Sequence, residues 1–506
     1  MANRCRRCRG GAGSVAELTR NLIAGKWEGA SGGESLEIRN PADNAESVGV
    51  VTMSGKADVD KAVKAAREAY KEWRLVPAPK RGEILFRAGE LLARRKQELG
   101  ELETREMGKV LPETLGDVQQ TIDLAYYMAG EGRRISGETL PSELPLKDCK
   151  SIRVPIGVCA LITPWNFPMA LPALKIMPAL VTGNTVVFKP SSYTSLSATR
   201  LVEILQEAGL PGGVLNLVHG RGEEIGEYLA THPEIDGISF TGSTSVGERL
   251  AAICVGLGKK VSCEMGGKNA IIVMDDARLE LAVEGAIWGG FGTSGQRCTA
   301  ASRIIVQEGV YSTFLEMFTE SAARLRLGNG LDNKTDVGPV ISGAQMEKVL
   351  HYMEIGRKEG ARLLTGGKAC RENACVNGYF IEPTIFSDVE PQMRIAQEEI
   401  FGPVVSVLKA KDLEDAIRIA NSTKYGLASS IYTQDVNKSA IAERDLDAGI
   451  IYINASTIGA EIHLPFGGMK RSGIGQREAG GRGGALDMFT TWKVIFRDFS
   501  GRSRRH

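Results

Sequence analysis

The chain has 506 residues, of which 24% are charged and 43% are hydrophobic, and its formal net charge is +1. A charge so close to zero excludes the strongly basic surfaces that nucleic-acid and membrane-surface partners require, so neither partner is predicted. A chain of this length outgrows a single hydrophobic core, and we expect two or three domains.

The nine cysteines and five histidines are scattered without regular spacing. An odd cysteine count of this kind is typical of a reducing compartment, which predicts a cytoplasmic location without a disulfide framework. The histidines are too few and too far apart for a metal cluster, so no metal is predicted. The most apolar region, residues 154–188, is interrupted by prolines and polar residues and is unsuited to crossing a bilayer.

Residues 1–14 differ from the rest of the chain, because they hold four arginines and no acidic residue. An Arg-rich, acid-poor start is also a feature of transit peptides, but this segment is short and shows no amphipathic periodicity. We therefore predict a disordered tail.

Hydrophobic spacing predicts the fold class. Apolar residues recur at three- and four-residue steps between residues 57 and 106 and predict helices there, and a further helix is expected at about 114–130. Residues 137–145 are expected to form an exposed excursion. From residue 156 onward, helical segments alternate with apolar runs of strand length, which lie at residues 158–162, 185–188, 214–218, 235–240 and 270–273. This alternation predicts an α/β fold in which a parallel sheet is covered by helices on both faces.

Residues 291–303 contain the first candidate for catalysis, Cys298, which follows a Gly-Thr-Ser-Gly run and precedes a predicted strand. The neighbouring Arg297 is a fixed positive charge, so we expect it to favour the thiolate, which is the nucleophilic form of cysteine. A buried structural cysteine is the alternative interpretation.

Two further residues have the chemistry of an acyl-transfer site. Glu264 lies between an apolar strand and a Gly-Gly turn, where partial burial raises a carboxyl pKa toward neutrality and suits a general base. Asn166 lies between two prolines at the end of an apolar strand, and its rigid amide suits an oxyanion hole. A surface glutamate and a turn asparagine are the respective alternatives.

Glycine-rich turns predict a phosphate site. Residues 220–226 follow a strand and open a helix, which is where a dinucleotide pyrophosphate binds, although the spacing departs from G-x-G-x-x-G by one residue. A glycine-capped turn without a ligand is the alternative. Residues 241–247 form a second turn of this kind. In residues 398–403, two adjacent acids precede Phe401 and a predicted tight turn, and the segment is a further candidate for the site. A solvated acidic pair is the alternative interpretation.

Taken in order, these segments resemble the aldehyde dehydrogenase superfamily, from about Asn21 to about Asp498. The resemblance rests on the blocks Glu-Met-Gly-Gly-Lys-Asn at 264–269, Gly-Gln-Arg-Cys at 295–298, Glu-Glu-Ile-Phe-Gly-Pro at 398–403 and Pro-Phe-Gly-Gly at 465–468. It implies a Rossmann-like cofactor-binding domain, an α/β catalytic domain and a small β oligomerisation extension. The implied boundaries are 15–131 and 152–267 for the cofactor domain, 268–470 for the catalytic domain, and 132–151 and 471–506 for the extension.

The resemblance also implies a role for each candidate residue. The Cys298 thiolate attacks the aldehyde, the Asn166 amide and the Cys298 backbone N–H hold the oxyanion, and Glu264 activates the water that hydrolyses the thioester. Lys175 is a further catalytic candidate that assists proton transfer, with a surface lysine as the alternative. The residues implied to bind the cofactor are Ile162, Pro164, Trp165, Lys189, Ser191, Ser192, Gly222, Gly226, Ser243, Met265, Glu399 and Phe401.

Ser192 departs from the family pattern, in which NAD-preferring members commonly carry glutamate at this position. A glutamate there accepts hydrogen bonds from the adenosine ribose and repels a 2′-phosphate, whereas Ser192 removes that repulsion and Lys189 can pair with the phosphate. We therefore predict that the cofactor is NADP or NAD, with NADP accepted and its preference over NAD left open. The alternative is that Ser192 only weakens NAD binding.

The partner implied by the resemblance is a small-molecule aldehyde. Residues 129–135 resemble the family branches that act on succinic and 2-oxoglutaric semialdehyde, and residues 459–462 resemble the loop that grips a distal carboxylate in aminoadipic semialdehyde dehydrogenases. Arg297 is a candidate positive end for such a carboxylate. A broad-specificity aldehyde scavenger and a coenzyme A-acylating enzyme are the alternatives, and Glu264 argues for water as the acyl acceptor. The extension implies a homodimer or homotetramer.

Overall fold

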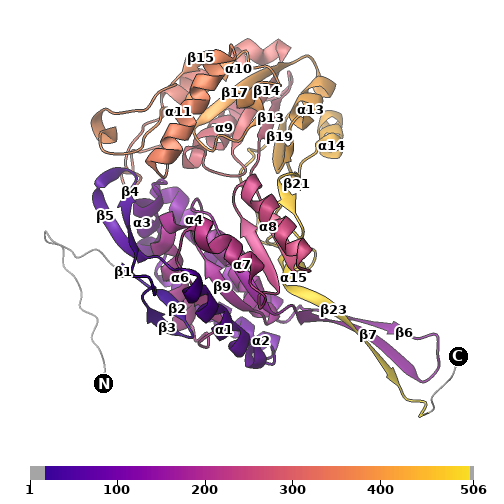
Figure 1. Ribbon diagram of the computed structural model, residues 1–506. Coiled ribbons are helices and arrows are strands. Elements are labelled where there is room, and N and C mark those ends of the chain that lie inside the picture. The colour runs from indigo at the N-terminus through magenta and orange to yellow at the C-terminus, as the bar shows by residue number, and fades with distance from the viewer. Residues whose placement is uncertain (1–17, 502–506) are drawn as a thin grey trace.

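The computed structural model describes residues 18–501, which form two α/β lobes and a narrow extension (Figure 1). The first lobe, at the bottom of Figure 1, holds most elements up to β12 (Lys260–Glu264). The second lobe, at the top, contains the elements from β13 (Asn269–Val273) to β20 (Ile450–Ile453). The tail expected at residues 1–14 lies outside the described residues.

The first lobe is built on an eight-stranded sheet. In sheet order its strands are β22 (Gly473–Ile474), β12, β11 (Gly237–Thr241), β8 (Val158–Ile162), β9 (Thr185–Lys189), β10 (Leu215–Leu217), β2 (Asn21–Ile23) and β3 (Lys26–Glu28). The strands from β12 to β10 are parallel, and β22, β2 and β3 add antiparallel edges. Along β8, Cys159 and Leu161 pack into one core while Val158 and Ala160 pack into another. This confirms the predicted parallel sheet with both faces covered.

Helices of different origin cover the two faces of this sheet. One layer contains α2 (Ala78–Arg94), α4 (Leu111–Glu131), α5 (Ala170–Thr182), α6 (Ser195–Glu207) and α15 (Ala485–Phe489). The other contains α1 (Lys56–Trp73), α7 (Glu227–Thr231) and α8 (Thr244–Gly256). Helix α3 (Lys96–Met107) leads into α4, and a small sheet of β1 (Leu18–Thr19), β5 (Asp43–Thr52) and β4 (Ser35–Asn40) lies at the edge of the lobe.

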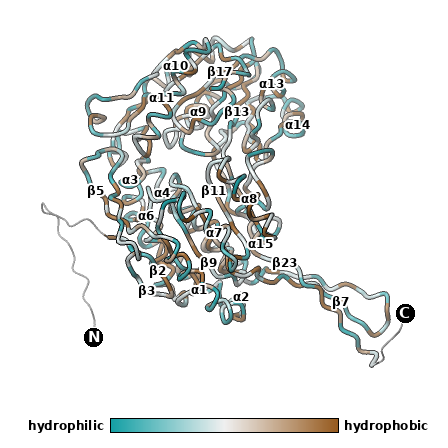
Figure 2. The backbone as a smooth tube through the Cα atoms, viewed as in Figure 1, coloured by the Kyte–Doolittle hydropathy of each residue, from teal (hydrophilic) through white to brown (hydrophobic). Residues whose placement is uncertain are grey.

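The second lobe repeats the α/β layering around a seven-stranded sheet. In sheet order its strands are β15 (Arg362–Thr365), β16 (Thr384–Ser387), β17 (Val404–Ala410), β14 (Ala301–Gln307), β13, β19 (Ala428–Tyr432) and β20. All neighbours are parallel except the edge pair β15 and β16. Its helices are α9 (Leu279–Phe291), α10 (Tyr311–Ala323), α11 (Gly343–Lys358), α12 (Arg394–Gln397), α13 (Leu413–Asn421) and α14 (Val436–Asp445). Apolar residues concentrate along the inner strands of both lobes (Figure 2).

The extension is a three-stranded antiparallel sheet of β6 (Glu138–Pro141), β7 (Lys147–Pro155) and β23 (Thr490–Asp498), which projects from the first lobe (Figure 1). Within the described residues, only β23 of the segment expected at 471–506 joins this sheet. The earlier part does not, because β22 pairs with β12 in the first lobe and α15 packs against α5. The tertiary pairing of two residues of β22 therefore moves the start of the extension to β23.

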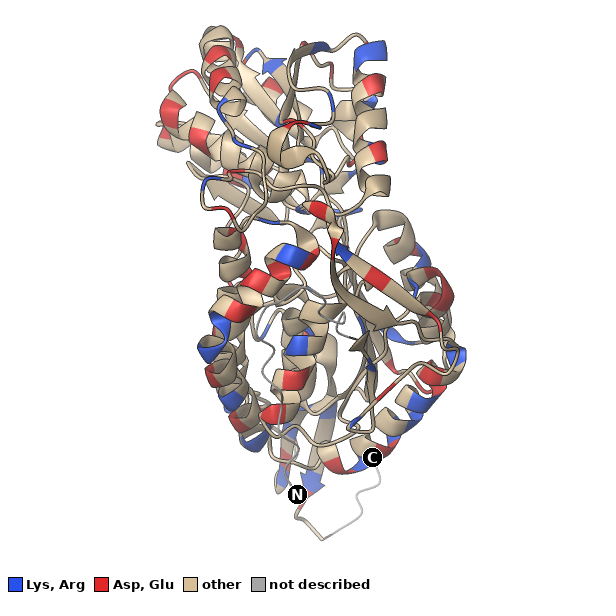
Figure 3. Cartoon of the chain, turned by 90° about the vertical axis from the view of Figure 1, so that its left-hand side faces the viewer, with Lys and Arg blue, Asp and Glu red and all other residues tan. Residues whose placement is uncertain are grey.

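The surface carries both signs of charge, interspersed along the outer helices (Figure 3). Short ion pairs such as Lys71 with Glu68 and Lys80 with Glu83 lie one turn apart on helices α1 and α2. Among residues 18–501, the structure contains no helix that combines the length and the apolar character needed to cross a membrane.

Candidate active site

A cleft lies at the carboxyl ends of the parallel strands of the first lobe, where β8 is flanked by β11 and β9. The strand order reverses there, and open α/β sheets bind their ligands at such points. Two cavities occupy the cleft, with volumes of 280 and 180 Å³. They share four lining residues, Pro164, Thr241, Gly242 and Ser243, and therefore adjoin each other.

The 280 Å³ cavity is lined by short turns of the first lobe. Its lining residues are Ile162, Thr163, Pro164, Lys189, Ser191, Ser192, Tyr193, Gly222, Phe240, Thr241, Gly242, Ser243 and Val246. No acid lines this cavity. Lys189 Nζ donates to the carbonyls of Pro190 and Gly220 at 2.7 and 3.2 Å, and Ser192 Oγ donates to the same Gly220 carbonyl at 3.1 Å. Burial lowers the pKa of Lys189 to about 8.

The two glycine-rich turns differ in their relation to this cavity. Ser243 precedes α8 at its N-terminus, where first-turn N–H groups have no partner within the helix and favour an anion. Gly222 lines the cavity and starts an irregular turn that ends at Gly226, but Gly226 does not line it. Thr163 Oγ1, also in the lining, is buried and has no protein partner in the described structure. A dinucleotide with its phosphates at α8 and its adenosine beside Ser192 fits these features.

The 180 Å³ cavity brings together eight of the sixteen predicted site residues, including the catalytic candidates Cys298 and Asn166. Its lining residues are Pro164, Trp165, Asn166, Leu171, Thr241, Gly242, Ser243, Met265, Gly266, Cys298, Gln345, Lys348, Glu399 and Phe401. Glu264 precedes the lining residue Met265 directly, at the end of β12. Lys175 lies outside the lining, on α5.

Cys298 lies on a loop that the backbone holds in an unusual shape. After α9, Thr293 and Ser294 adopt left-handed φ values of 53° and 56°. The Cys298 carbonyl accepts a hydrogen bond from Asn269 Nδ2 at 2.7 Å, which fixes the residue before β14 begins. Burial raises the pKa of the Cys298 thiol to about 12, and the charges of Glu399 and Glu264 add to that effect.

Arg297 does not act on this thiol as the sequence suggested. Its guanidinium lies 3.5 Å from Glu113 Oε1, its Nε donates to Thr293 Oγ1 at 2.8 Å, and it lies against the rings of Phe167 and Trp288. The charges that shift the thiol pKa are carboxylates, and they raise it. The expectation that Arg297 stabilises the thiolate is not borne out, because the guanidinium contacts Glu113 and two aromatic rings, and the charges that dominate at the thiol are those of Glu399 and Glu264.

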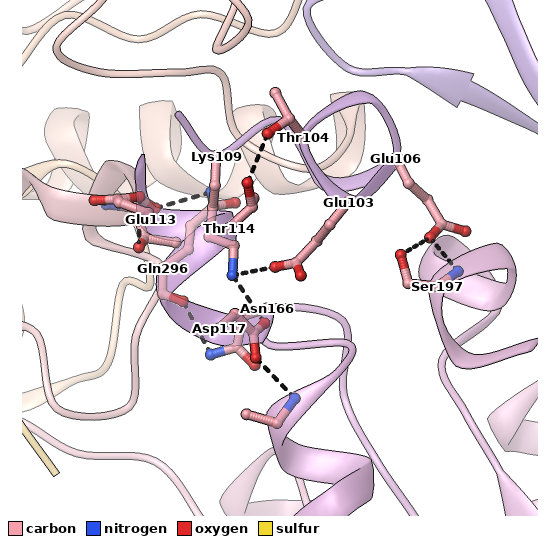
Figure 4. A network of polar contacts seen from close by, with 12 residues as sticks. Glu103, Thr104, Glu106, Lys109, Glu113, Thr114, Asp117, Asn166, Ser197 and Gln296 are labelled. Atoms are coloured by element: carbon pink, nitrogen blue, oxygen red, sulfur yellow. Dashed lines mark hydrogen bonds and ion pairs between the residues drawn. The ribbon is translucent and has the colours of Figure 1, made fainter. Parts of the chain in front are cut away.

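Asn166 is buried, and its orientation is set by the nucleophile loop (Figure 4). Its Nδ2 donates to the Gln296 carbonyl at 3.0 Å, while its Oδ1 has no partner in the described structure. The reverse orientation of the amide would set two oxygens against each other, so the Nδ2 assignment is the favourable one. The second N–H of Nδ2 is left for a ligand in the cavity.

Glu264 and Lys175 belong to one buried group of charges. Glu264 Oε2 accepts from the Gly468 N–H at 3.2 Å, and burial raises its pKa to about 8. Lys175 donates to Ser239 Oγ at 3.0 Å and contacts Glu478. Burial lowers the pKa of Lys175 to about 7, and the Glu264 charge opposes that shift. A carboxyl that titrates near neutrality beside a lysine is suited to moving protons.

The two adjacent acids of residues 398–403 have different environments. Glu398 pairs with Arg394 and accepts from Tyr352 near the surface. Glu399 lines the catalytic cavity and accepts from the Gly267 N–H at 3.1 Å. Burial raises the pKa of Glu399 above its ordinary value, against the Gly267 hydrogen bond and the Lys348 charge.

Phe401 has a left-handed φ of 62° and packs edge-on against Trp165, with ring centroids 5.3 Å apart. Gln345 Nε2 supports this turn by donating to the Phe401 carbonyl at 2.7 Å. Sequence reasoning missed Gln345 and Lys348, because they are ordinary polar residues on α11 and no local pattern marks them. It also missed Tyr452, whose pKa is raised to about 12 by burial, with the charges of Cys298 and Glu461 adding to the shift.

A parallel α/β lobe with a cleft at its switch point, lined by a half-buried cysteine and a buried amide and adjoined by a buried glutamate, has the groups that nucleophilic acyl chemistry requires. The model of the Aldehyde dehydrogenase family matches residues 27–495, and the chain belongs to this family. It is an oxidoreductase that acts on aldehydes, and its α/β fold is confirmed.

Known proteins resemble the chain over nearly its whole length. The alpha-ketoglutaric semialdehyde dehydrogenase of Bacillus subtilis is 42% identical, covering 94% of this chain and 97% of the relative. The 2,5-dioxopentanoate dehydrogenase of Saccharolobus solfataricus is also 42% identical, covering 94% and 96%. A crystal structure of betaine aldehyde dehydrogenase from Staphylococcus aureus in complex with NAD+ superposes with a TM-score of 0.93 at 35% identity, covering 96% of each chain.

Proposed function

We propose that this enzyme oxidises a short semialdehyde, an aldehyde with a carboxylate at its far end, to the dicarboxylic acid. The names of the Bacillus and Saccharolobus relatives denote one such compound, 2-oxoglutaric semialdehyde. The observation that carries the proposal is Arg297, whose side chain is only 10% exposed and lies directly beside the nucleophile in sequence. A guanidinium has five N–H donors, and only Nε of Arg297 donates a hydrogen bond within the described structure.

The far wall of the site supplies a second polar group. The loop after β20 is tied to the nucleophile segment, because Thr457 Oγ1 donates to the Thr299 carbonyl at 2.7 Å. Tyr452 lies on β20 within electrostatic range of both Cys298 and Glu461. We propose that Arg297 and the Tyr452 hydroxyl donate to the substrate carboxylate, with the rings of Phe167 and Trp288 flanking the Arg297 guanidinium.

The proposed chemistry has two steps, acylation and deacylation, and both take place at the Cys298 sulfur. The Cys298 thiolate adds to the aldehyde carbon, and the Asn166 amide and Cys298 backbone N–H stabilise the oxyanion. When bound, the nicotinamide cofactor supplies the hydride acceptor. Glu264 then takes a proton from the water that attacks the Cys298 thioester, which releases the acid and restores the thiolate. Lys175 and Glu478 are proposed to carry that proton onward, since Lys175 contacts Glu478 and lies within electrostatic range of Glu264.

The cofactor is proposed to be NAD or NADP, held with its adenosine beside Ser192. Support for NAD comes from the Staphylococcus structure, which contains NAD+. Support for NADP comes from the lining of the 280 Å³ cavity, which contains Lys189 and no acid that would repel a 2′-phosphate. Glu399, Lys348 and Phe401 line the other end of the cleft, and we propose that the first two hold the nicotinamide ribose and that Phe401 packs beside the ring.

The test is kcat/KM for a panel of aldehydes with each cofactor. We expect 2-oxoglutaric or succinic semialdehyde to exceed hexanal and benzaldehyde by tenfold or more, which corresponds to about 1.4 kcal/mol of discrimination. Arg297→Leu should remove that advantage, because only the semialdehydes carry the negative end; since it also takes the guanidinium away from Glu113, hexanal oxidation should fall too, by a smaller factor. Omitting coenzyme A should not reduce product formation. Preference for hexanal or benzaldehyde would overturn the proposal in favour of a broad aldehyde scavenger.

The enzyme is further proposed to form a homodimer or homotetramer through the extension. Large apolar side chains are exposed on or beside this sheet, and they are Leu140, Leu146, Trp492, Val494, Phe496 and Phe499. Exposed apolar patches of this kind mark protein interfaces. Light scattering of the intact chain and of the double variant Val494→Lys, Phe496→Lys tests the proposal, because a multimer that assembles through β23 should dissociate in the variant.

A further inference from the structure

Helix α4 carries two buried acids in its first two turns, Glu113 and Asp117, which lie near Gln296 and Asn166 (Figure 4). Residues four apart lie on the same face of a helix, so the two carboxylates point to one side. The predicted chemistry uses neither residue, and neither lines the cavity that contains Cys298. Each acid nevertheless binds a segment that carries a catalytic candidate: Glu113 binds the loop before Cys298, and Asp117 binds the segment after Asn166.

Glu113 holds the nucleophile loop. Its Oε1 accepts from the Thr293 backbone N–H at 2.8 Å and its Oε2 accepts from Thr293 Oγ1 at 3.0 Å. The same carboxylate lies 3.5 Å from the Arg297 guanidinium. Left-handed φ values at Thr293 and Ser294 cost free energy and persist only where surrounding contacts impose them. Glu113 supplies such contacts at Thr293, which lies five residues before Cys298.

Asp117 holds the turn that carries the oxyanion amide. Its Oδ1 accepts from the Ala170 backbone N–H at 2.7 Å, at the first residue of α5. Its Oδ2 accepts from Lys109 Nζ at 3.2 Å, and that ammonium lies 4.1 Å from the centre of the Phe167 ring. The segment 166–170 is thereby fixed at both ends, since Asn166 itself donates to Gln296.

The charges around α4 are balanced inside the protein. Like charges four residues apart on a helix repel each other, but Arg297 faces Glu113 and Lys109 faces Asp117. Burial opposes the Lys109 charge, yet Glu103 at 2.5 Å and Asp117 outweigh burial and raise the Lys109 pKa. Burial, together with the Asp117 charge, raises the pKa of Glu103 well above its ordinary value, and Glu103 and Asp117 both lie in ion-pair contact with Lys109.

We propose that Glu113 and Asp117 form a clamp, the α4 clamp, that sets the position of the Asn166 amide relative to the Cys298 sulfur. One turn of α4 connects the carboxylate that binds the nucleophile loop to the carboxylate that binds the segment after Asn166. The Asn166–Gln296 hydrogen bond links that segment back to the nucleophile loop. Both acids are positioning residues, because they touch neither substrate nor cofactor. The inference rests on the proposed roles of Asn166 and Cys298.

The decisive experiment is a double-mutant cycle between Asp117→Asn and Asn166→Ala in the full chain. Asp117→Asn is expected to lower kcat at least tenfold while KM for the cofactor stays within twofold, because the amide is displaced and the adenosine end is untouched. In the Asn166→Ala background, the same substitution is expected to change kcat by less than twofold. A purely structural role would instead lower kcat by the same factor in both backgrounds, and that result overturns the clamp.

A second measurement, the rate of Cys298 alkylation by iodoacetamide, distinguishes the role of Glu113 from that of Asp117. Glu113→Gln should change this rate severalfold because it releases the nucleophile loop, whereas Asp117→Asn should leave it within twofold. Equal effects of the two variants on alkylation would contradict the assignment. If Asp117→Asn yields no folded protein, Asp117→Glu keeps the charge but displaces it, and the same coupling to Asn166→Ala is expected.

A matched control is Glu106→Gln. Glu106 is another buried acid of this region, but it accepts from Leu196 and Ser197 at the start of α6 instead of facing the catalytic loops (Figure 4). Its effect should be the same with or without Asn166→Ala. If Asn166→Ala itself leaves kcat unchanged, the proposed function and the clamp both fail; if only the coupling is missing, the clamp alone fails.

Discussion

The two ends of the cleft are built in different ways. At the catalytic end, polar side chains are held by partners far away in the chain, as in the contacts of Asn166 with Gln296 and Glu399 with Gly267. At the adenosine end, Lys189 and Ser192 both donate to Gly220, within two neighbouring strand-to-helix turns. The contacts at the catalytic end therefore join the two lobes, whereas the contacts at the adenosine end lie within the first lobe. Substitutions at the first end should therefore change catalysis, and substitutions at the second should change cofactor selection alone.

The strongest test of this division is Cys298→Ala. Loss of the nucleophile should reduce dehydrogenase and esterase activity by about 10⁴-fold or more. NAD(P) affinity, measured by fluorescence titration, should stay within twofold, because the adenosine end does not depend on the thiol. Cys375→Ala is the matched control, since that buried cysteine packs against Phe380, away from the cleft. Substantial turnover in Cys298→Ala would refute the assignment of the nucleophile.

Glu264→Gln is expected to have the next largest effect, and it acts on one step. Deacylation should slow by about 10²- to 10⁴-fold, so that thioester accumulates in a single turnover. In the native enzyme the base is active only when deprotonated, so the deacylation rate should rise with pH through about 8 and level off above it. The glutamine variant should lack this rise. An unchanged pH profile would place the base elsewhere.

Ser192→Glu should have the smallest effect and should be confined to the adenosine end. The added carboxylate repels a 2′-phosphate and accepts from a ribose hydroxyl, so the NADP to NAD ratio of kcat/KM should fall by about tenfold, or about 1.4 kcal/mol. Ser192→Ala adds no charge and should leave the ratio within twofold. The maximal rate with saturating NAD should not change in either variant. A constant ratio in Ser192→Glu would remove this residue from cofactor selection.

The sequence was sufficient to predict those features of the fold and the family that arise from residues close together in the chain. The alternation of apolar runs with helical periods predicted the parallel sheet of the first lobe, and the blocks around Glu264, Cys298 and Glu399 identified the family. Both kinds of signal arise from residues close together in the chain, where hydrophobic period and turn chemistry act directly. The carboxyl ends of parallel strands share one edge of a sheet, so the motifs at the ends of β8, β11 and β12 had to meet.

Only the tertiary structure decided the charges at the site. Arg297 was expected to favour a thiolate because it is adjacent to Cys298 in the chain, but its guanidinium lies beside Glu113 on α4. Gln345 and Lys348 reach the cavity from α11, and no spacing in the sequence connects that helix to the nucleophile. Electrostatic interactions depend on distance in space and on burial, and neither quantity is encoded in local spacing. The sequence therefore predicted which groups carry the proposed chemistry, whereas packing determined their pKa values and their partners.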